Sequence, residues 1–255
     1  MTVQLLISTM NQTDYSLVEK MNIFTDAIVI NQCNCNSYCE FEYSGHKVKW
    51  YDCNERGVGK SRNKALMAAD ADICVFADDD MVYMENALQV VKEAFGELVN
   101  ADIISFNVEG LVKSAEIRRL HTWNAFKHGA CRLAVRRKKV LQSRVFFSLL
   151  FGGGAEFSCG EDTLFLLDCL KSGLRMYETS QYIGWNTCGE STWFQGYIEK
   201  FFVDRGVLFY SMNPRLAKIY SLRYVLLKHK LYGESVSRKQ AWKWLLEGVK
   251  YGKQM

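Results

Sequence analysis

The chain has 255 residues, of which 49% are hydrophobic and 13% aromatic, and its formal net charge at pH 7 is +4. This length and composition argue against a disordered chain and allow one large domain or two small ones. The net charge is too small to indicate a nucleic-acid-binding protein.

Short apolar runs alternate with helical segments through the first hundred residues. We expect strands at residues 3–8, 27–30, 47–51, 73–77 and 102–108, and helices at 15–21 and 85–98. Residues 54–69 begin as a glycine-containing turn and become helical, whereas residues 34–45 are polar and are predicted to be irregular. This alternation is typical of βαβ units and of a mainly parallel sheet.

The second half of the chain is less regular. A strand is predicted at 131–135, a helix at 136–151, and another helix at 163–170 after a loop with three consecutive glycines. From about Gln195 the chain is predicted to be helical, with Asn213 and Pro214 as the N-cap and first residue of one helix. The basic residues between 110 and 145 include Lys113, Arg118, Arg119, Lys127, Arg132, Arg136, Arg137, Lys138 and Lys139.

No segment of the sequence predicts a signal peptide or a membrane-spanning helix. The longest apolar runs are far shorter than the ~20 residues that span a bilayer. The C-terminal helices mix apolar and basic residues, which fits either solvated basic faces or an amphipathic surface that meets anionic lipid. We expect a cytoplasmic protein that is soluble or bound at the inner face of the cell membrane.

The nine cysteines are scattered through predicted strands and helices, which indicates buried thiols in a reducing compartment. Cys33, Cys35 and Cys39 have the spacing C-x-C-x3-C, and Cys53 follows 14 residues later. Most zinc sites use paired C-x2-C spacings instead. Plain thiols are therefore the default interpretation, and a structural zinc is the alternative.

Three carboxylates, Asp78, Asp79 and Asp80, directly follow the apolar run at 73–77. Like charges ~4 Å apart repel by about 1 kcal/mol in water and by more in a partly dry cleft. A divalent cation removes this repulsion, because hard cations prefer carboxylate oxygens. Ligands of open α/β sheets bind beyond the carboxyl ends of the strands, so the cluster is either a metal and phosphate site or an acidic turn.

Two further motifs carry charged groups. G-V-G-K-S at 57–61 is not a P-loop, because Asn54 stands where that motif needs its first glycine. A glycine-rich turn leading into a helix, with Lys60, Arg62 and Lys64 nearby, still suits a diphosphate. Glu161 and Asp162 precede the helix predicted at 163–170, where acids also favour the helix dipole.

In this order, the motifs resemble those of the inverting family 2 glycosyltransferases. E-R-G-V-G-K-S-R-N at 55–63 resembles their turn after the third strand, and A-D-D-D-M at 77–81 resembles their D-x-D element. G-G-G-A-E-F-S-C-G-E-D-T-L-F at 152–165 resembles the segment with their catalytic residue, and E-S-T-W-F at 190–194 a motif of some capsule and lipopolysaccharide sugar transferases. The resemblance covers about residues 1–195.

The resemblance implies an α/β protein with the Rossmann-like GT-A fold: a mixed, mainly parallel sheet flanked by helices, with a C-terminal helical extension. We expect a GT-A domain at residues 1–200 and the helical extension at 201–255. Within the domain, residues 1–109 would form the nucleotide-sugar-binding half and residues 110–200 the acceptor half.

The activity implied by the resemblance is transfer of a sugar, with inversion, from a nucleotide-diphosphate sugar to an acceptor saccharide hydroxyl in cell-surface polysaccharide biosynthesis. UDP is the commonest nucleotide of such donors. Asp78 and Asp80 would hold Mg²⁺ or Mn²⁺, which stabilises the leaving diphosphate. Asp162 would be the base for the acceptor hydroxyl, with Glu161 as the alternative or as its hydrogen-bonding neighbour. With an ordinary pKa, Asp162 would be ionised at pH 7.

The resemblance also implies the donor contacts. Thr9 and Gln32 would lie at the nucleotide base, Arg62 at the phosphates or base, and Asp79 at the ribose or the metal ligands. Family members often have an acidic residue after the second strand, where this chain has Asn31 and Gln32. Both amides can hydrogen-bond a base edge, so the identity of the base stays open.

Side chains after residue 184 could serve the acceptor. Trp185, Trp193, Phe194 and Tyr197 could stack on sugar rings or pack in the core. The basic segment at 110–145 could bind an acceptor diphosphate, such as that of a lipid-linked saccharide.

Two other functions compete with this interpretation. A catalytically degenerate homologue would bind nucleotide-sugar or a partner transferase, but Asp78, Asp80 and Asp162 are all present. A sugar nucleotidyltransferase would need a glycine-rich signature directly after the first strand, and the sequence after Thr9 is M-N-Q-T-D.

Overall fold

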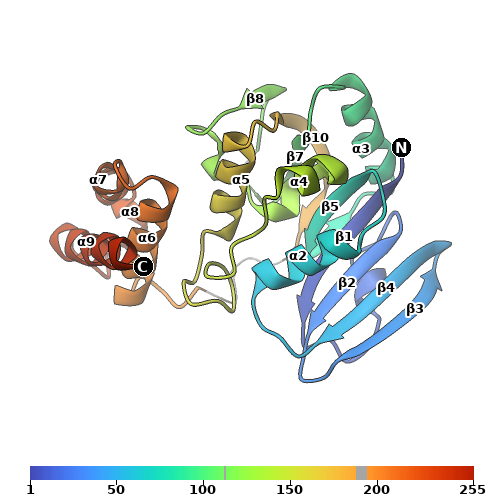
Figure 1. Cartoon of the computed structure of the whole chain (residues 1–255), viewed down its shortest axis with the longest axis horizontal. Coiled ribbons are helices and arrows are strands. Elements are labelled where there is room, and N and C mark those ends of the chain that lie inside the picture. The colour runs from blue at the N-terminus through green and yellow to red at the C-terminus, as the bar shows by residue number, and fades with distance from the viewer. Residues whose placement is uncertain (112, 188–193) are drawn as a thin grey trace.

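The computed structural model describes residues 1–111, 113–187 and 194–255, and it has a sheet-containing part and a group of C-terminal helices (Figure 1). Within these ranges one ten-stranded sheet has the order β3-β4-β2-β1-β5-β9-β7-β10-β6, with β8 paired to β10. The strands are β1 (Val3–Met10), β2 (Ala27–Gln32), β3 (Ser37–Tyr43), β4 (His46–Cys53), β5 (Ile73–Asp78), β6 (Met81–Tyr83), β7 (Ile103–Glu109), β8 (Arg118–Leu120), β9 (Leu133–Arg136) and β10 (Met176–Asn186).

The helices lie between and after these strands. They are α1 (Leu17–Lys20), α2 (Val58–Ala68), α3 (Ala87–Glu97), the 3₁₀ turns η1 (Ala125–Lys127) and η2 (Ala130–Arg132), α4 (Arg137–Ser143), α5 (Glu161–Lys171), α6 (Glu199–Met212), α7 (Ala217–Leu227), α8 (His229–Tyr232) and α9 (Arg238–Gln254). Two apolar clusters include side chains on alternate positions of the strands, as expected of a sheet that is covered on both faces.

Four strands that run parallel, β4, β2, β1 and β5, form the centre of the N-terminal half of the sheet. The apolar runs of β1, β2 and β5 are buried, which is why each of these three reads as a continuous hydrophobic segment, whereas β4 buries only some of its residues. Because the strands are parallel, their carboxyl ends meet at one edge, where Thr9 pairs with Asn31 and Ser8 with Asp78. The predicted α/β class, with a mixed sheet flanked by helices and a C-terminal helical part, is confirmed.

The prediction of an irregular segment at 34–45 is wrong, because β3 occupies Ser37–Tyr43 and pairs antiparallel with β4. β3 is an edge strand whose half-buried residues alternate with exposed ones, so it has no apolar run. The hairpin turn at Ser44 and Gly45 has positive φ at both residues, 50° and 78°. This pair of residues was the available signal for a hairpin.

The predicted helix at 136–151 ends earlier, since α4 stops at Ser143 and Arg144 is left-handed with φ 56°. The chain then runs as a loop that carries Phe147 onto Phe76 and Phe165 in the core. Asn63 of α2 hydrogen-bonds both the main-chain N–H and the carbonyl of Phe147. These tertiary contacts outweigh the local helical preference.

Asn213 does not cap a helix that starts at Pro214. Its Oδ1 accepts hydrogen bonds from the N–H groups of Arg215 and Leu216, so the residues form a turn and α7 begins at Ala217.

Strand β10 was not predicted, because polar residues interrupt its sequence and its pairing with β7 shifts register twice.

The helices α6 to α9 share a third apolar cluster with the loop before α5 and with α5 itself. Gly206 of α6 and Gly248 of α9 allow the two helices to touch, because a Cβ at either position would lie within 2.3 Å of a carbonyl oxygen of the other helix. The helical part is therefore anchored next to the segment that carries Glu161 and Asp162.

No helix in the described ranges has the length and apolar character needed to cross a membrane.

Candidate functional site

A cluster of charged side chains forms at the carboxyl edge of the parallel strands. Asp78 ends β5, Asp79 and Asp80 follow it, Arg62 comes from α2, and Glu161 and Asp162 open α5. The fold thus brings together groups that lie up to 100 residues apart in the sequence.

Arg62 lies at the centre of this cluster, with only 4% of its side chain exposed. Its guanidinium donates hydrogen bonds to Asp78 Oδ1 at 2.8 Å, Glu161 Oε1 at 3.0 Å and Asp162 Oδ1 at 2.7 Å. A buried guanidinium is costly unless it is paired, and Arg62 is paired with three carboxylates in a small volume. Arg62 therefore holds α2, β5 and α5 in a fixed relation.

Burial raises the pKa of Asp162 to about 7, a shift that Arg62 opposes and that the nearby carboxylates of Glu161 and Asp78 reinforce. The main-chain N–H of Ala130 hydrogen-bonds the Asp162 carboxylate and also opposes the shift. The expectation of an ordinary pKa for Asp162 is wrong, because burial cannot be read from the motif. A carboxyl group with a pKa near neutrality can both accept and release a proton at physiological pH.

Thr9 and Asp79 are brought together on the β1 side of the site. The Thr9 hydroxyl donates to Asp79 Oδ2 at 2.6 Å, and the amide of Gln12 donates to the Thr9 oxygen at 2.9 Å. Gln12 also exchanges hydrogen bonds with the side chain of Asn31. Sequence analysis missed Gln12, since a single amide in a loop carries no motif.

Gln32 is buried, and its Oε1 accepts a hydrogen bond from the N–H of Gly57 at 2.7 Å. Gly57 precedes α2 with φ 125°, a conformation that favours glycine. Gln32 therefore ties the end of β2 to the turn before α2. Its predicted contact with a nucleotide base stays a prediction.

Asp52, at the end of β4, was also missed. Burial alone would raise its pKa, but hydrogen bonds from Ser37, Asn31 and Trp50 hold that pKa below its usual value. An ionised carboxylate thus lies beside Asn31, on the strand next to β2. The acid that the end of β2 lacks is present one strand away.

Asp80 is the residue most suited to a cation. Burial raises the pKa of its carboxyl, a hydrogen bond with Asn186 lowers it, and the neighbouring Asp78 and Asp79 raise it. Its Oδ1 is buried without a hydrogen-bond partner among the described residues. A buried carboxylate oxygen of this kind fits a divalent cation, which binds oxygen and offsets the repulsion of the adjacent acids.

The cysteine loop offers a second group of ligand types. Cys33 Sγ, Cys35 Sγ and a carboxylate oxygen of Asp52 lie within 4.8 Å of one another. Cys39 instead lies against the Tyr15 hydroxyl, and Lys64 donates to Cys53 Sγ. The sulfur atoms of the four cysteines therefore do not form one tetrahedral site.

Comparisons with known proteins point to one family. The family model described as Glycosyl transferase family 2 matches residues 32–153. A search of curated proteins found no match.

Solved structures show the same fold at low identity. The chain is similar to S. aureus TarS 1-349 in complex with UDP-GlcNAc, with a TM-score of 0.67 and 15% identity over 98% of this chain and 82% of that one. For the complex of TarS 1-349 with UDP, the TM-score is 0.65 and the identity 14%, over 98% and 80% of the two chains. For the mannosyltransferase PcManGT from Pyrobaculum calidifontis in complex with GDP-Man and Mn2+, the TM-score is 0.50 and the identity 11%, over 99% and 75%. These likenesses confirm the GT-A fold.

Replacement of Arg62 by Met should lower the free energy of unfolding near pH 8 by about 3–5 kcal/mol, because three carboxylates lose their counter-charge. Arg62 opposes the raised pKa of Asp162, so without it that pKa lies further above its unfolded value. Ionisation of Asp162 then costs more stability as the pH rises, so the loss should be smaller near pH 5. Urea unfolding at both pH values measures this difference.

Lys60, an exposed residue of the same helix, provides the matched control, and Lys60→Met should change stability by less than about 0.5 kcal/mol. An equal loss at the two pH values for Arg62→Met would show that packing, and not charge, explains the role of Arg62.

Proposed function

We propose that this chain moves a sugar from a nucleotide-diphosphate sugar to an acceptor saccharide hydroxyl with inversion. The match of the glycosyl transferase family 2 model to residues 32–153 supports this proposal. The observation that carries the proposal is the Arg62 cluster, in which a carboxyl with a pKa of about 7 lies next to the acids of the D-x-D element. The role in cell-surface polysaccharide biosynthesis rests on the resemblance of the motifs alone.

The donor would bind at the carboxyl edge of β1, β2 and β5. Structures of similar fold were solved with UDP-GlcNAc, UDP and GDP-Man, which supports a nucleotide-diphosphate sugar, with UDP as the first choice of nucleotide. Thr9 and Gln32 would contact the base, Asp79 the ribose, and Arg62 the phosphates. The network of Gln12, Asn31 and Asp52 adds further polar groups for the base.

Asp78 and Asp80 would hold Mg²⁺ or Mn²⁺. The cation supplies electrostatic stabilisation of the negative charge that develops on the departing diphosphate. The unpartnered Asp80 oxygen supports this assignment, as does the PcManGT structure that contains Mn2+.

Asp162 would be the general base. In a single displacement, the acceptor oxygen forms a bond to the anomeric carbon, the bond from that carbon to the diphosphate oxygen breaks, and the hydroxyl proton passes to Asp162. Glu161 shares Arg62 with Asp162 and would keep the base oriented. In the alternative, a degenerate homologue, the same cluster would be purely structural.

The acceptor would enter a pocket of about 650 Å³ between the loop before α5 and the helices α6 and α7. Its lining includes Cys159, two residues before Glu161, and the aromatic residues Phe194, Tyr197, Phe201 and Tyr224. The Arg205 guanidinium lies against the rings of Phe201 and Tyr224, at 4.7 and 4.8 Å from their centroids. Aromatic rings together with a half-buried cation suit a saccharide that carries negative charge.

Trp185, for which the sequence left sugar stacking and core packing both open, lies on β10 with 42% of its surface exposed. Trp193 and the residues 190–193 of the E-S-T-W-F motif lie outside the described residues. The proposed division of the chain keeps a donor half at 1–109, an acceptor half at 110–200 and a helical extension at 201–255.

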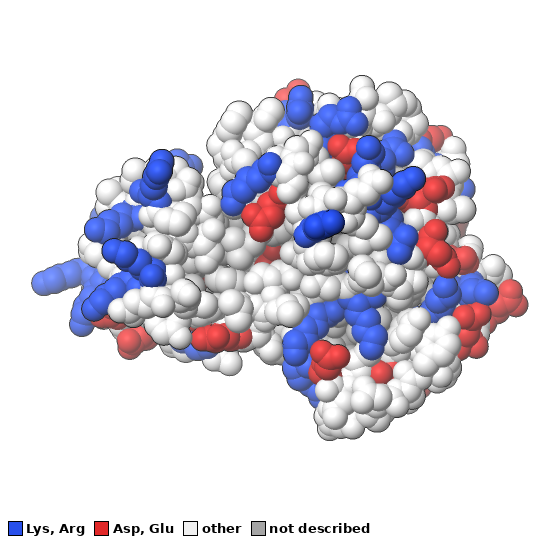
Figure 2. Space-filling model, viewed as in Figure 1, with Lys and Arg blue, Asp and Glu red and all other residues white. Residues whose placement is uncertain are grey.

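The helical extension would bind the inner face of the membrane peripherally. The outer side of α7 and α8 exposes large apolar side chains, whereas its inner side is buried. The exposed residues are Ile219, Leu222, Leu226, Leu227 and Leu231. Lys218, Arg223, Lys228 and Lys230 alternate with them, and Figure 2 shows Lys and Arg side chains gathered over this lobe. An apolar stripe with basic flanks suits an anionic bilayer surface.

Vesicle flotation tests the membrane proposal. The protein should float with vesicles that contain phosphatidylglycerol but not with phosphatidylcholine alone, and the double substitution Leu226→Ser, Leu227→Ser should abolish flotation. Val99→Ser, at an exposed position of the sheet-containing part, is the control and should leave it unchanged. Equal flotation of the wild type with both lipids, or of the double variant with the anionic vesicles, would contradict the proposal.

A nucleotide that binds the native state raises the melting temperature by mass action. UDP or GDP at about 100 times Kd should raise it by roughly 5–10 °C, and only when Mn²⁺ or Mg²⁺ is present. Asp80→Asn should remove the metal-dependent part of the shift. Glu85→Gln, at an exposed acid nearby in the chain, should keep it. A wild-type protein that no nucleotide stabilises would count against the donor site.

Asp162→Asn should reduce the release of UDP from a UDP-sugar, with water or saccharide as acceptor, by about 10²–10⁴-fold. The base must be ionised to accept a proton, so kcat/KM of the wild type should rise about tenfold per pH unit below pH 7 and level off above it. Asp168→Asn removes an exposed carboxylate from the same helix and should change neither rate nor profile. Full activity of Asp162→Asn would refute the role of the base.

A further inference from the structure

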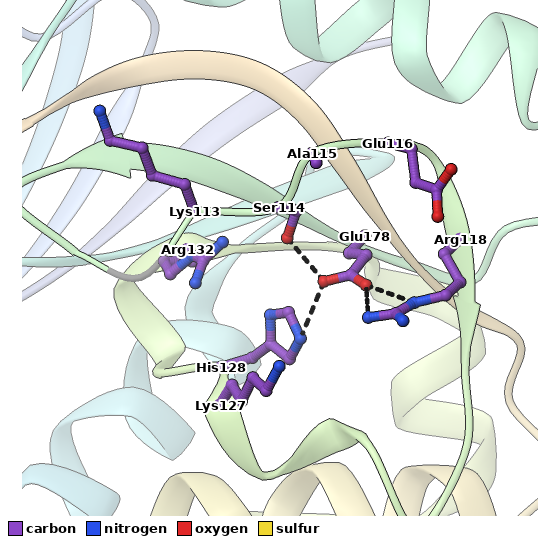
Figure 3. A pocket seen from close by; sticks show the side chains of 9 residues that line it. All are labelled: Lys113, Ser114, Ala115, Glu116, Arg118, Lys127, His128, Arg132 and Glu178. Atoms are coloured by element: carbon purple, nitrogen blue, oxygen red, sulfur yellow. Dashed lines mark hydrogen bonds and ion pairs between the residues drawn. The ribbon is translucent and has the colours of Figure 1, made fainter.

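A second polar pocket lies beside the Arg62 cluster, with a volume of about 120 Å³ (Figure 3). Its walls are the loop that follows β7, the turns η1 and η2, and Glu178 of β10. The pocket is small beside the pocket of about 650 Å³ at α6 and α7, and its size suits one small oxyanion.

Positive charge exceeds negative charge in this pocket. The lining contains four cations, Lys113, Arg118, Lys127 and Arg132, and two carboxylates, those of Glu116 and Glu178. Glu178 is already satisfied, because it accepts hydrogen bonds from Ser114 Oγ at 2.6 Å and from Nε and a terminal nitrogen of Arg118. Lys113 hydrogen-bonds Tyr182, whereas neither Lys127 nor Arg132 has a carboxylate within ion-pair distance among the residues that the structure describes.

Arg132 is the unusual group. Its residue surface is only 1% exposed, yet no carboxylate of the described chain lies within ion-pair distance of its guanidinium. Its two hydrogen bonds go to neutral acceptors, the Phe106 carbonyl at 2.8 Å and Asn107 Oδ1 at 3.2 Å. Glu178 acts on Arg132 from beyond ion-pair distance, yet burial still lowers the pKa of Arg132. The buried charge is therefore incompletely balanced, and a bound anion would stabilise it.

His128 supplies a second unsatisfied buried group. Its residue surface is 4% exposed, and its Nε2 has no hydrogen-bond partner in the described part of the chain, with Glu178 Oε2 3.4 Å away. Burial and Arg132 lower the pKa of His128 to about 4, so the ring is neutral at pH 7. When Nδ1 accepts a hydrogen bond from the Ser105 hydroxyl at 2.8 Å, the ring proton stands on Nε2, which faces the pocket beside Glu178 Oε2.

We propose that this pocket binds a phosphate group, with Arg132, Lys127 and the Nε2–H of His128 as donors. Lys127 is exposed at the pocket mouth and has no ion-pair partner in the described ranges, so it is free to close on the anion. Figure 3 shows His128 and Lys127 beside each other and facing Glu178.

The position of the pocket connects it with Asp162. His128 and Arg132 line the pocket, while Gly129 and Ala130 between them face Asp162: a Cβ on Gly129 would lie 3.4 Å from Asp162 Oδ2, and Ala130 hydrogen-bonds the carboxylate. The phosphate could be free phosphate or, if the proposed transferase function holds, a phosphate group of the acceptor. The chemistry of recognition is the same in both cases.

Isothermal titration of the full chain with inorganic phosphate tests the site. The wild type should bind, and Lys127→Met should weaken binding about tenfold, since it removes one charge-assisted contact. Arg132→Met should abolish binding. Because Arg132 is buried and its loss could unfold the protein, Lys127→Met, at an exposed position, is the decisive variant. Lys138→Met, at an exposed position of α4, is the matched control and should bind like the wild type.

Two further titrations identify the site and the source of the phosphate. Saturating UDP with Mn²⁺ should leave phosphate binding unchanged, because the donor site is separate. If glucose 1-phosphate binds as tightly as inorganic phosphate, and Lys127→Met loses the same affinity for both, the site is assigned to an acceptor phosphate. If inorganic phosphate alone binds, the site is assigned to the free ion. Absent binding, displacement by UDP, or equal affinity of Lys127→Met and wild type would overturn the proposal. These readouts do not depend on sugar transfer.

Discussion

The ion pairs of Arg62 are the constraint on which the arrangement of this site depends. One guanidinium, almost completely buried, hydrogen-bonds carboxylates from β5 and from the start of α5. Without it, three carboxylates would repel one another in a poorly solvated volume. With it, Asp162 stays close to the point where its charge state can change, because burial and Arg62 act in opposite directions on its pKa.

The parallel strands explain why the site lies where it does. Strands β4, β2, β1 and β5 all end at one edge, so Asp52, Asn31, Thr9 and Asp78 lie in neighbouring registers although they come from four segments. The turn before α2, in which Gly57 is buried, then brings Arg62 to that edge. The helices α6 to α9 pack against the loop before α5, which places an aromatic pocket beside the same carboxylates.

The Gly129–Ala130 segment separates two polar environments. On one side it contacts Asp162, and on the other its neighbours His128 and Arg132 line a pocket with excess positive charge. Both environments contain buried groups whose charge is not fully balanced by the chain itself. Such groups are expected where a protein binds charged ligands and are rare where it serves only its own stability.

The sequence by itself determined the α/β class and most of the N-terminal strands and helices, because apolar runs report local burial. Short motifs also singled out Arg62, Asp78, Glu161 and Asp162, which the fold brings into one cluster. It did not reveal β3, the end of α4, Gln12, Asp52 or the pocket at Arg132. Tertiary structure decided these features: β3 depends on pairing with β4, α4 ends where Phe147 enters the core, and the polar groups acquire partners from distant segments. The raised pKa of Asp162 likewise depends on burial, which arises only when α5 packs against the sheet, since no motif encodes desolvation.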